Sequence, residues 1–446
     1  MQAASMPSME APAFLDHAVA SKIRDNHATP VFVYSEEVLK QRARAALAFP
    51  NPYGLTVRYA MKACPNAAVL KLFSGLGVCF DCSSGYEVQR AICAGIPAEK
   101  LSLSTQDLPT PNAKFQELID LGIKFNACSL HQLETFGRLY AGSSCGIRFN
   151  PGTGSGGNTK TNVGGPSSSF GIWHELQGKV KEIVETHSLT ISRIHTHIGS
   201  GSDPKIWHAV TAMSLALVDA FPDATTINLG GGFKVGRMMH ERDNDSSSLQ
   251  AVGAPVKAAL EEFADKNGRQ LQLEIEPGTF LLANSGVLLS TVQDMTTTTN
   301  TNTDTGASSG HEFLKLDCGM TEVLRPSLYG AQHPIISVVD PATYRGETKD
   351  YVVVGHCCES GDLFSCKPGN SDELQARTLA KTSIGDMVVI EGSGAYCSSM
   401  CTKNYNSFPE APEVLLSGGD RIQLMRRRQS LEQIISNEVE VELNLN

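Results

Sequence analysis

Short apolar strand candidates alternate with amphipathic helical stretches between about residues 30 and 280, and this alternation constrains the fold more than any other feature. The strand candidates are Val31–Tyr34, Thr56–Ala60, Val78–Asp81, Leu101–Leu103, Phe125–Ala127, Cys145–Phe149, Thr190–His197, Thr226–Leu229 and Leu271–Ile275. Helical stretches such as Ser35–Ala48 and Leu130–Tyr140 lie between them. A strand–helix unit repeated over about 250 residues predicts an α/β fold, a (β/α)8 barrel of the TIM type.

The pattern changes after about residue 283, where strand candidates follow one another without regular helices. These candidates are Val287–Val292, His311–Leu316, Tyr351–Val354, Met387–Ile390 and Glu413–Leu416. The expected domains are an N-terminal segment, 1–29, that packs on the β domain, a barrel, 30–282, and a C-terminal mostly-β domain, 283–446. Residues 295–310 are rich in Thr, Asn and Ser, which predicts a hairpin tip with no assigned role.

Composition excludes several classes of function. A net charge of −10 argues against nucleic acid or an anionic membrane as the main partner. We see no apolar run of about 18 residues and no basic and apolar leader at the N-terminus. The 12 cysteines are scattered through apolar segments, and Cys79 and Cys82 have no second pair to complete a metal site. We therefore expect a cytoplasmic enzyme without a bound metal.

Lys62 ends the apolar run that begins at Val57. A lysine that is buried loses stability as a cation, so its amine becomes a nucleophile. Such an amine can attach to an aldehyde such as pyridoxal phosphate. A lysine at a strand end can also simply extend its ammonium group to solvent, so this segment alone leaves both interpretations open.

Three further groups follow strand candidates, and the carboxyl ends of barrel strands share one face. His197 can be a core residue, a metal ligand or a flat ring stacked on a planar cofactor. Gly230–Gly232 can bring backbone N–H groups close to a phosphate, or can form a tight turn. Glu276 can hold a pyridine nitrogen protonated. His195 is expected to point to the opposite face from His197 and to be structural.

Jointly, these motifs resemble those of the pyridoxal-phosphate-dependent decarboxylases, which share an alanine-racemase-like barrel with ornithine decarboxylase. The motifs in family order are Tyr59–Asn66, His195–Ser200, Gly230–Gly232, Glu276–Gly278, Cys358–Asp362 and Gly394–Tyr396. Within the family, Asp317–Met320, Arg325–Tyr329 and Glu359 are most similar to the diaminopimelate decarboxylases. The resemblance implies a cofactor-binding barrel followed by a β domain. It also implies decarboxylation of meso-2,6-diaminopimelate to L-lysine and CO2, the last step of lysine biosynthesis.

The resemblance implies a role for each residue of the site. Lys62 would bind the cofactor covalently, His197 would stack on its ring, and Glu276 would pair with its nitrogen. The phosphate would be held by Ser200, Gly230, Gly231, Gly232, Glu276, Pro277, Gly278, Thr279 and Tyr396. Cys358 would protonate the carbon that has lost CO2. The amino-acid substrate would contact Arg325, Tyr329, Glu359 and Tyr396. Cys358 and Glu359 would reach the active site of a second subunit, which implies a homodimer with shared active sites.

One departure from the family pattern concerns the substrate. Thr279 stands where the family usually has an arginine after Glu-Pro-Gly, and a threonine cannot make a bidentate contact with a carboxylate. Thr279 therefore favours an alternative, decarboxylation of ornithine, lysine or a carboxylated polyamine precursor, whereas Arg325 and Glu359 favour diaminopimelate. An inactive binding homologue is disfavoured, because Lys62, Glu276 and Cys358 are all present. A racemase that uses the same cofactor is disfavoured by the Cys-Glu-Ser-Gly-Asp segment, Cys358–Asp362.

Overall fold

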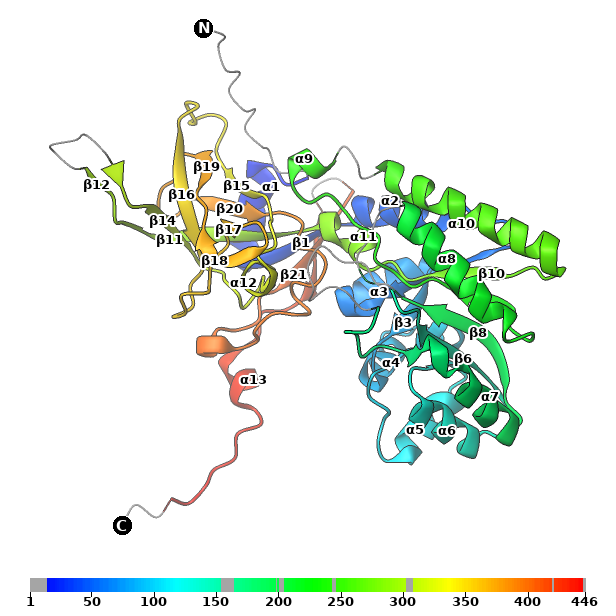
Figure 1. The fold of residues 1–446 in the computed structure, drawn as a ribbon. Helices are drawn as coiled ribbons and strands as arrows, with labels where there is room; N and C mark the ends of the chain where they lie inside the picture. Colours follow the sequence, from blue (N-terminus) through cyan, green and yellow to red (C-terminus); the bar gives the residue numbers. More distant parts are fainter. Residues whose placement is uncertain are drawn as a thin grey trace, which may run out of the picture. The chain divides into compact units, whose positions relative to one another are not determined.

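The computed structural model describes residues 14–153, 164–197, 199, 204–242, 246–301, 308–418 and 421–443. The chain divides into two compact units (Figure 1). The barrel unit is Glu37–Asn284. The β unit combines Met1–Glu36 with Ser285–Asn446.

Eight parallel strands form the barrel, and each pairs with two neighbours. They are β2 (Leu55–Ala60), β3 (Cys79–Cys82), β4 (Leu101–Leu103), β5 (Lys124–Ala127), β6 (Ser144–Asn150), β8 (Thr190–Thr196), β9 (Thr226–Asn228) and β10 (Gln272–Ile275). The order β5-β4-β3-β2-β10-β9-β8-β6 closes because β6 also pairs with β5. The short strand β7 (Ile172–Trp173) adds to β6. The predicted (β/α)8 barrel is confirmed.

Helices separate the barrel strands along the chain. They are α2 (Glu36–Leu47), α3 (Ala67–Gly75), α4 (Gly85–Cys93), α5 (Asn112–Asp120), α6 (Leu130–Leu139), α7 (Gln177–Thr186), α8 (Pro204–Asp219), α9 (Met239–Arg242), α10 (Ser246–Asn267) and α11 (Thr279–Leu282). Side-chain caps fix where several of them begin: Asn66, Ser84 and Ser129 each accept a backbone N–H of the first turn. In Figure 1, α8 and α10 lie side by side along the barrel unit.

The β unit is built on a mixed sheet, as the predicted mostly-β domain requires. Its longest path runs β19-β16-β14-β11-β1-β21-β22; off this path, β20 pairs with β11, and β15 pairs with β20. The strands are β1 (Val31–Ser35), β11 (Gly286–Thr297), β14 (Glu312–Leu316), β15 (Ile335–Val338), β16 (Thr348–Val354), β19 (Arg377–Ala380), β20 (Met387–Ile390), β21 (Glu413–Ser417) and β22 (Arg421–Arg426). The hairpin β17 (Cys366–Lys367) and β18 (Asn370–Leu374) and the helices α1 (His17–His27), α12 (Arg325–Tyr329) and α13 (Leu431–Ile435) complete the unit.

The first strand of the chain lies in the β unit, although the sequence placed it in the barrel. β1 pairs antiparallel with β11 and parallel with β21, and all five of its residues are buried. Val31, Val33, Val287 and Val414 share one apolar cluster with α1. An apolar strand followed by a helix has the same local pattern in either unit, so only these long-range partners decide where it belongs.

The Thr/Asn-rich segment 295–310 begins as a hairpin. β11 continues to Thr297 and pairs with β14, and beyond it β12 (Asn300–Thr301) pairs antiparallel with β13 (Ser308–Ser309). No helix in the described part of the chain is long and apolar enough to cross a membrane.

Candidate active site

Four neighbouring barrel strands end at the residues that were expected to share one face. β8, β9, β10 and β2 are consecutive in the sheet. His197 follows β8, Gly230–Gly232 follow β9, Glu276 follows β10 and Lys62 follows β2. Because the carboxyl ends of parallel strands meet at the same rim, the barrel places these groups at one end.

Glu276 is buried, and each of its carboxylate oxygens has a polar neighbour. Asn228 Nδ2 donates to its Oε1 at 2.7 Å, and His195 Nε2 lies 3.4 Å from its Oε2. Burial opposes ionisation, but the nearby His195, His197 and Arg148 outweigh it and hold the pKa of Glu276 well below its ordinary value. Glu276 is therefore an anion at neutral pH.

The expectation that His195 points to the other face is wrong. Side chains two residues apart in a strand share a face, so His195 points to the same side as His197. His195 is buried there beside Glu276. Its Nδ1 lies 3.5 Å from Asn126 Nδ2, which can only donate. The proton of a neutral His195 is thus on Nε2, directed at Glu276. Burial lowers the pKa of His195, so the neutral form is favoured.

The three glycines pack against His197 and Glu276. Gly231 N–H donates to His197 Nδ1 at 3.1 Å, and Gly230 N–H donates to Asn228 Oδ1 at 2.8 Å. Burial, Arg148 and Lys62 lower the pKa of His197 well below its usual value, which agrees with a neutral ring that accepts at Nδ1. Gly230 has φ +69°, and a Cβ there would crowd the His197 ring. A Cβ on Gly231 would collide with the carbonyl oxygen of Glu276. Only glycine fits these two positions.

Lys62 lies in a short 3-10 helix, Met61–Ala63, and is exposed rather than buried. Two carboxyl groups share its surroundings. Burial raises the pKa of Asp81 to about 8, with Glu276 adding to the rise and Lys62 opposing it. Burial also raises the pKa of Glu87, whose Oε2 accepts Ser83 N–H at 2.6 Å. The amine of Lys62 thus lies near two carboxyl groups whose pKa values are both raised.

A buried ionic cluster underlies this rim. Glu274 accepts from Arg58 Nη2 at 2.7 Å and from Arg193 Nη1 at 3.0 Å. Burial opposes ionisation of Glu274, but Arg193 and Arg58 lower its pKa to about 2. Asn228 Nδ2 also reaches Glu274 Oε2 at 3.3 Å, so one amide links Glu274 to Glu276. The cluster links β2, β8, β9 and β10 by hydrogen bonds near the carboxyl ends of these strands, just before the site residues.

The remaining phosphate candidates of the barrel unit follow β10. Pro277 accepts Ala60 N–H through its carbonyl oxygen at 3.3 Å, Gly278 precedes α11, and Thr279 is its half-buried first residue. Ser200 lies outside the described residues.

The other candidate residues lie in the β unit. Arg325 and Tyr329 are both on α12, with the guanidinium carbon of Arg325 5.8 Å from the centre of the Tyr329 ring. Cys358 and Glu359 are exposed on the loop between β16 and β17. Tyr396 is half-buried with a left-handed φ of 56°.

Two side chains anchor the Cys358 loop. Asn406 Oδ1 accepts Cys358 N–H at 2.8 Å. Asp362 is buried and accepts Met320 N–H at 2.7 Å and Cys357 N–H at 2.8 Å. The loop is thus fixed by hydrogen bonds on both sides of Cys358 even though its tip is exposed.

Comparison with known proteins identifies the family. Residues 35–283 match the family described as pyridoxal-dependent decarboxylase, pyridoxal binding domain. The chain is 33% identical over 416 residues to a diaminopimelate decarboxylase of Escherichia coli (strain K12). The aligned region covers 92% of this chain and 94% of the relative. A crystal structure of diaminopimelate decarboxylase has a TM-score of 0.82 and 31% identity, and covers 93% of this chain and 94% of the other. The crystal structure of diaminopimelate decarboxylase from Helicobacter pylori complexed with L-lysine has a TM-score of 0.78 and 26% identity. The match covers 93% of this chain and 98% of the other.

The chain belongs to the pyridoxal-dependent decarboxylases. The cofactor of this family is pyridoxal phosphate, and the rim of the barrel fits it. The fixed anion of Glu276 suits a pyridinium nitrogen, and Gly230 and Gly231 leave the backbone bare where a side chain would block access. The N–H groups of Gly230 and Gly231 donate to Asn228 and His197, whereas no described residue accepts the N–H of Gly232.

The sequence left out several polar residues that this decarboxylase places at the rim. Asp81 is the penultimate residue of β3, and Arg148 is a buried residue of β6 whose Nε has no hydrogen-bond partner among the described residues. Asn228 ends β9 and joins Glu274 to Glu276. The signal that finds them is position: each is a polar residue near the carboxyl end of a buried barrel strand.

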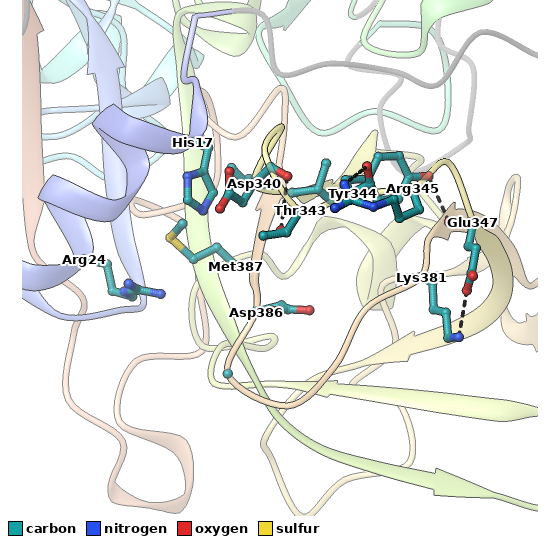
Figure 2. Close-up of a pocket in the computed structure, with 13 residues that line it drawn as sticks. His17, Arg24, Asp340, Thr343, Tyr344, Arg345, Glu347, Lys381, Asp386 and Met387 are labelled. Atoms are coloured by element: carbon teal, nitrogen blue, oxygen red, sulfur yellow. Dashed lines mark hydrogen bonds and ion pairs between the residues drawn. The ribbon is translucent and has the colours of Figure 1, made fainter.

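A separate pocket lies within the β unit (Figure 2). Its volume is about 310 Å³, and its lining includes His17, Arg24 and Asp386. Lys381 and Glu347 in its wall form an ion pair at 2.7 Å, as Figure 2 shows. None of the candidate site residues lines this pocket, so we assign it no part in the reaction.

Proposed function

We propose that this decarboxylase converts meso-2,6-diaminopimelate to L-lysine and CO2, the last step of lysine biosynthesis. The observation that carries the proposal is the similarity to diaminopimelate decarboxylases over 92% of the chain, because it includes both units and not the cofactor-binding part alone. A structural relative is a diaminopimelate decarboxylase complexed with L-lysine, the product of the proposed reaction, and this supports the same substrate class.

In the proposed reaction, pyridoxal phosphate supplies a ring that accepts the electron pair left behind when CO2 departs. The Lys62 amine would provide the covalent attachment point, and the Asp81 carboxyl group acts on it electrostatically. The Glu276 carboxylate would keep the ring nitrogen protonated, and His197 would pack on the ring face. The backbone of Gly230–Gly232 and Glu276–Thr279, with Ser200 and Tyr396, would hold the phosphate. These roles rest on the family resemblance and on the rim geometry.

The β unit supplies the remaining groups of the proposal. The Cys358 thiol protonates the carbon that has lost CO2, and its exposed position lets it deliver that proton outside its own unit. Arg325, Tyr329, Glu359 and Tyr396 bind the substrate. We further propose a homodimer in which Cys358 and Glu359 complete the active site of the second subunit. All 12 cysteines, each among the described residues, are free thiols, which supports a reducing, cytoplasmic location.

The alternative substrate is another basic amino acid: ornithine, lysine or a carboxylated polyamine precursor. Thr279 favours it, because a half-buried threonine at the start of α11 gives no guanidinium to a second carboxylate.

The deciding experiment measures CO2 release by the cofactor-loaded enzyme from meso-diaminopimelate, L-lysine and L-ornithine, each supplied separately. Release from diaminopimelate alone is the expected result. Release from a monocarboxylate alone would replace the proposed substrate and assign Thr279 to that change.

A second experiment tests the assignment of Arg325 to the distal carboxylate. Arg325→Ala should raise KM for diaminopimelate by about ten- to a hundredfold, because a charge-assisted hydrogen bond contributes roughly 1.5–3 kcal/mol. Arg345→Ala is a matched control, since Arg345 lies on an exposed turn of the same unit. An unchanged KM in Arg325→Ala would remove Arg325 from the substrate site.

A further inference from the structure

Residues 438–443 have the pattern of a two-faced strand but lie unpaired. The segment alternates strictly between acidic and aliphatic residues: Glu438, Val439, Glu440, Val441, Glu442 and Leu443. Such alternation is typical of a strand with one charged and one apolar face. In the structure the segment pairs with no described strand, and Val439, Val441 and Leu443 are 80%, 65% and 75% exposed. Figure 1 shows it extending from α13 away from the sheet of its own unit.

An open sheet edge of matching length exists in the same unit. β22 is the last strand of the sheet path; β21 pairs with one of its edges, and no described strand pairs with the other. β22 has six residues, the length of the alternating segment. Ile422 packs against the apolar cluster of α1 and β1, while Leu424 on the same face is 47% exposed. An added strand that puts aliphatic side chains beside Leu424 would extend this apolar face.

The charges of the two segments are complementary. Arg421 and Arg427 flank the open edge, both are exposed, and neither forms an ion pair with another described residue. Arg426 differs, because Glu410 already binds it at 2.9 Å. Glutamates at every second position of the alternating segment would meet these free guanidinium groups once the backbones pair.

We propose that residues 438–443 of one chain add as a strand to the open edge of β22 in a second copy of this chain. Each copy offers both the strand and the edge, so the exchange can be reciprocal, as in an isologous dimer. A second copy is favoured over the chain's own edge because α13 separates β22 from the segment and leads it away from the sheet. This contact is independent of the substrate and of the reaction.

The first test removes the strand. The cofactor-loaded protein ended after Ser436 should dissociate to monomers at a concentration at least about tenfold higher than the full chain, since several cross-strand pairs are lost from each tail. Mass photometry over a dilution series measures this. Val439→Glu combined with Glu442→Val keeps the composition but breaks the alternation, and should weaken the dimer as truncation does. Equal dissociation constants for all three proteins would overturn the proposal.

The second test exchanges the charges. One variant carries Glu438→Lys, Glu440→Lys and Glu442→Lys, and the other carries Arg421→Glu and Arg427→Glu. Each alone places like charges against each other and should dissociate more readily. Their mixture restores opposite charges at both contacts of a heterodimer, so it should dimerise as the parent does. A mixture that dissociates as readily as either variant alone would overturn the proposed exchange. Pairing of residues 438–443 with β22 of the same parent chain would overturn it as well.

Discussion

At the scale of single residues, the chemistry of the barrel rim depends most on Glu276. Its carboxylate stays ionised although it is buried, because Asn228 donates to one oxygen and His195 lies close to the other. Glu276→Gln removes the negative charge while keeping the shape, so kcat should fall by at least about a hundredfold. Steady-state kinetics and the absorption band of the bound cofactor measure the loss. Glu261→Gln, an exposed partner of Lys257 on α10, is the control and should change neither.

Asp81 should make the stability of the cofactor-free protein depend on pH. Its pKa rises from 3.8 to about 8 on folding, through burial and Glu276. Between these values the folded protein holds a proton that the unfolded chain has lost, so the free energy of unfolding falls as pH rises. Asp81→Asn should therefore be more stable than the parent at about pH 8 and nearly equal below about pH 4, by urea unfolding. Asp223→Asn, at an exposed position, is the control. A gain that is the same at both pH values would contradict the assignment.

The sequence predicted the rim residues that follow strands, because Lys62, His197 and Glu276 need only the strand ends to be placed. It did not predict the partners that set their charge. His195 was put on the wrong face, and Arg148 and Asn228 look like ordinary residues of apolar strands until the barrel closes around them. Their importance is a property of three-dimensional neighbours.

At the scale of elements, the loop that carries Cys358 is held by a neighbouring turn. Asn404, Asn406 and Ser407 all have left-handed φ values, of 60°, 52° and 61°, in a turn that presents Asn406 Oδ1 to Cys358 N–H. Left-handed backbone at non-glycine residues is strained, and asparagine tolerates it best. The turn therefore adopts a strained backbone conformation that places Asn406 within hydrogen-bond distance of the Cys358 loop.

We predict that Asn406→Ala frees this loop. The substitution removes the hydrogen bond and strains the turn, so kcat should fall about threefold to thirtyfold, as the loss of one hydrogen bond and one backbone preference implies. Asn406→Asp keeps the acceptor oxygen and should rescue most of the loss. The alkylation rate of Cys358 by a thiol reagent provides a readout separate from turnover. Equal rates in the parent and Asn406→Ala would show that the turn does not position the thiol.

At the scale of the whole molecule, an N-terminal strand stabilises a sheet made from the other end of the chain. Val33 is fully buried, and β1 lies between β11 and β21. Val33→Asp puts a carboxylate into this apolar cluster and should destabilise the β unit by about 3 kcal/mol or more. Limited proteolysis should then open sites within 285–417 before sites in the barrel unit. Asn26→Asp adds the same group at an exposed position nearby and should leave the pattern unchanged. Cleavage that begins in the barrel would contradict this coupling.

Because the chain is synthesised from its N-terminus, the pairing of β1 with its neighbours is delayed. A ribosome releases β1 before any barrel strand, β11 about 250 residues later, and β21 later still. The barrel can close while β1 still waits, as an apolar strand without either of its neighbours. A prematurely ended product keeps that strand exposed, because its last partner was never made. The first strand of the chain thus stays without its two neighbours until the segments beyond the barrel sequence have been made.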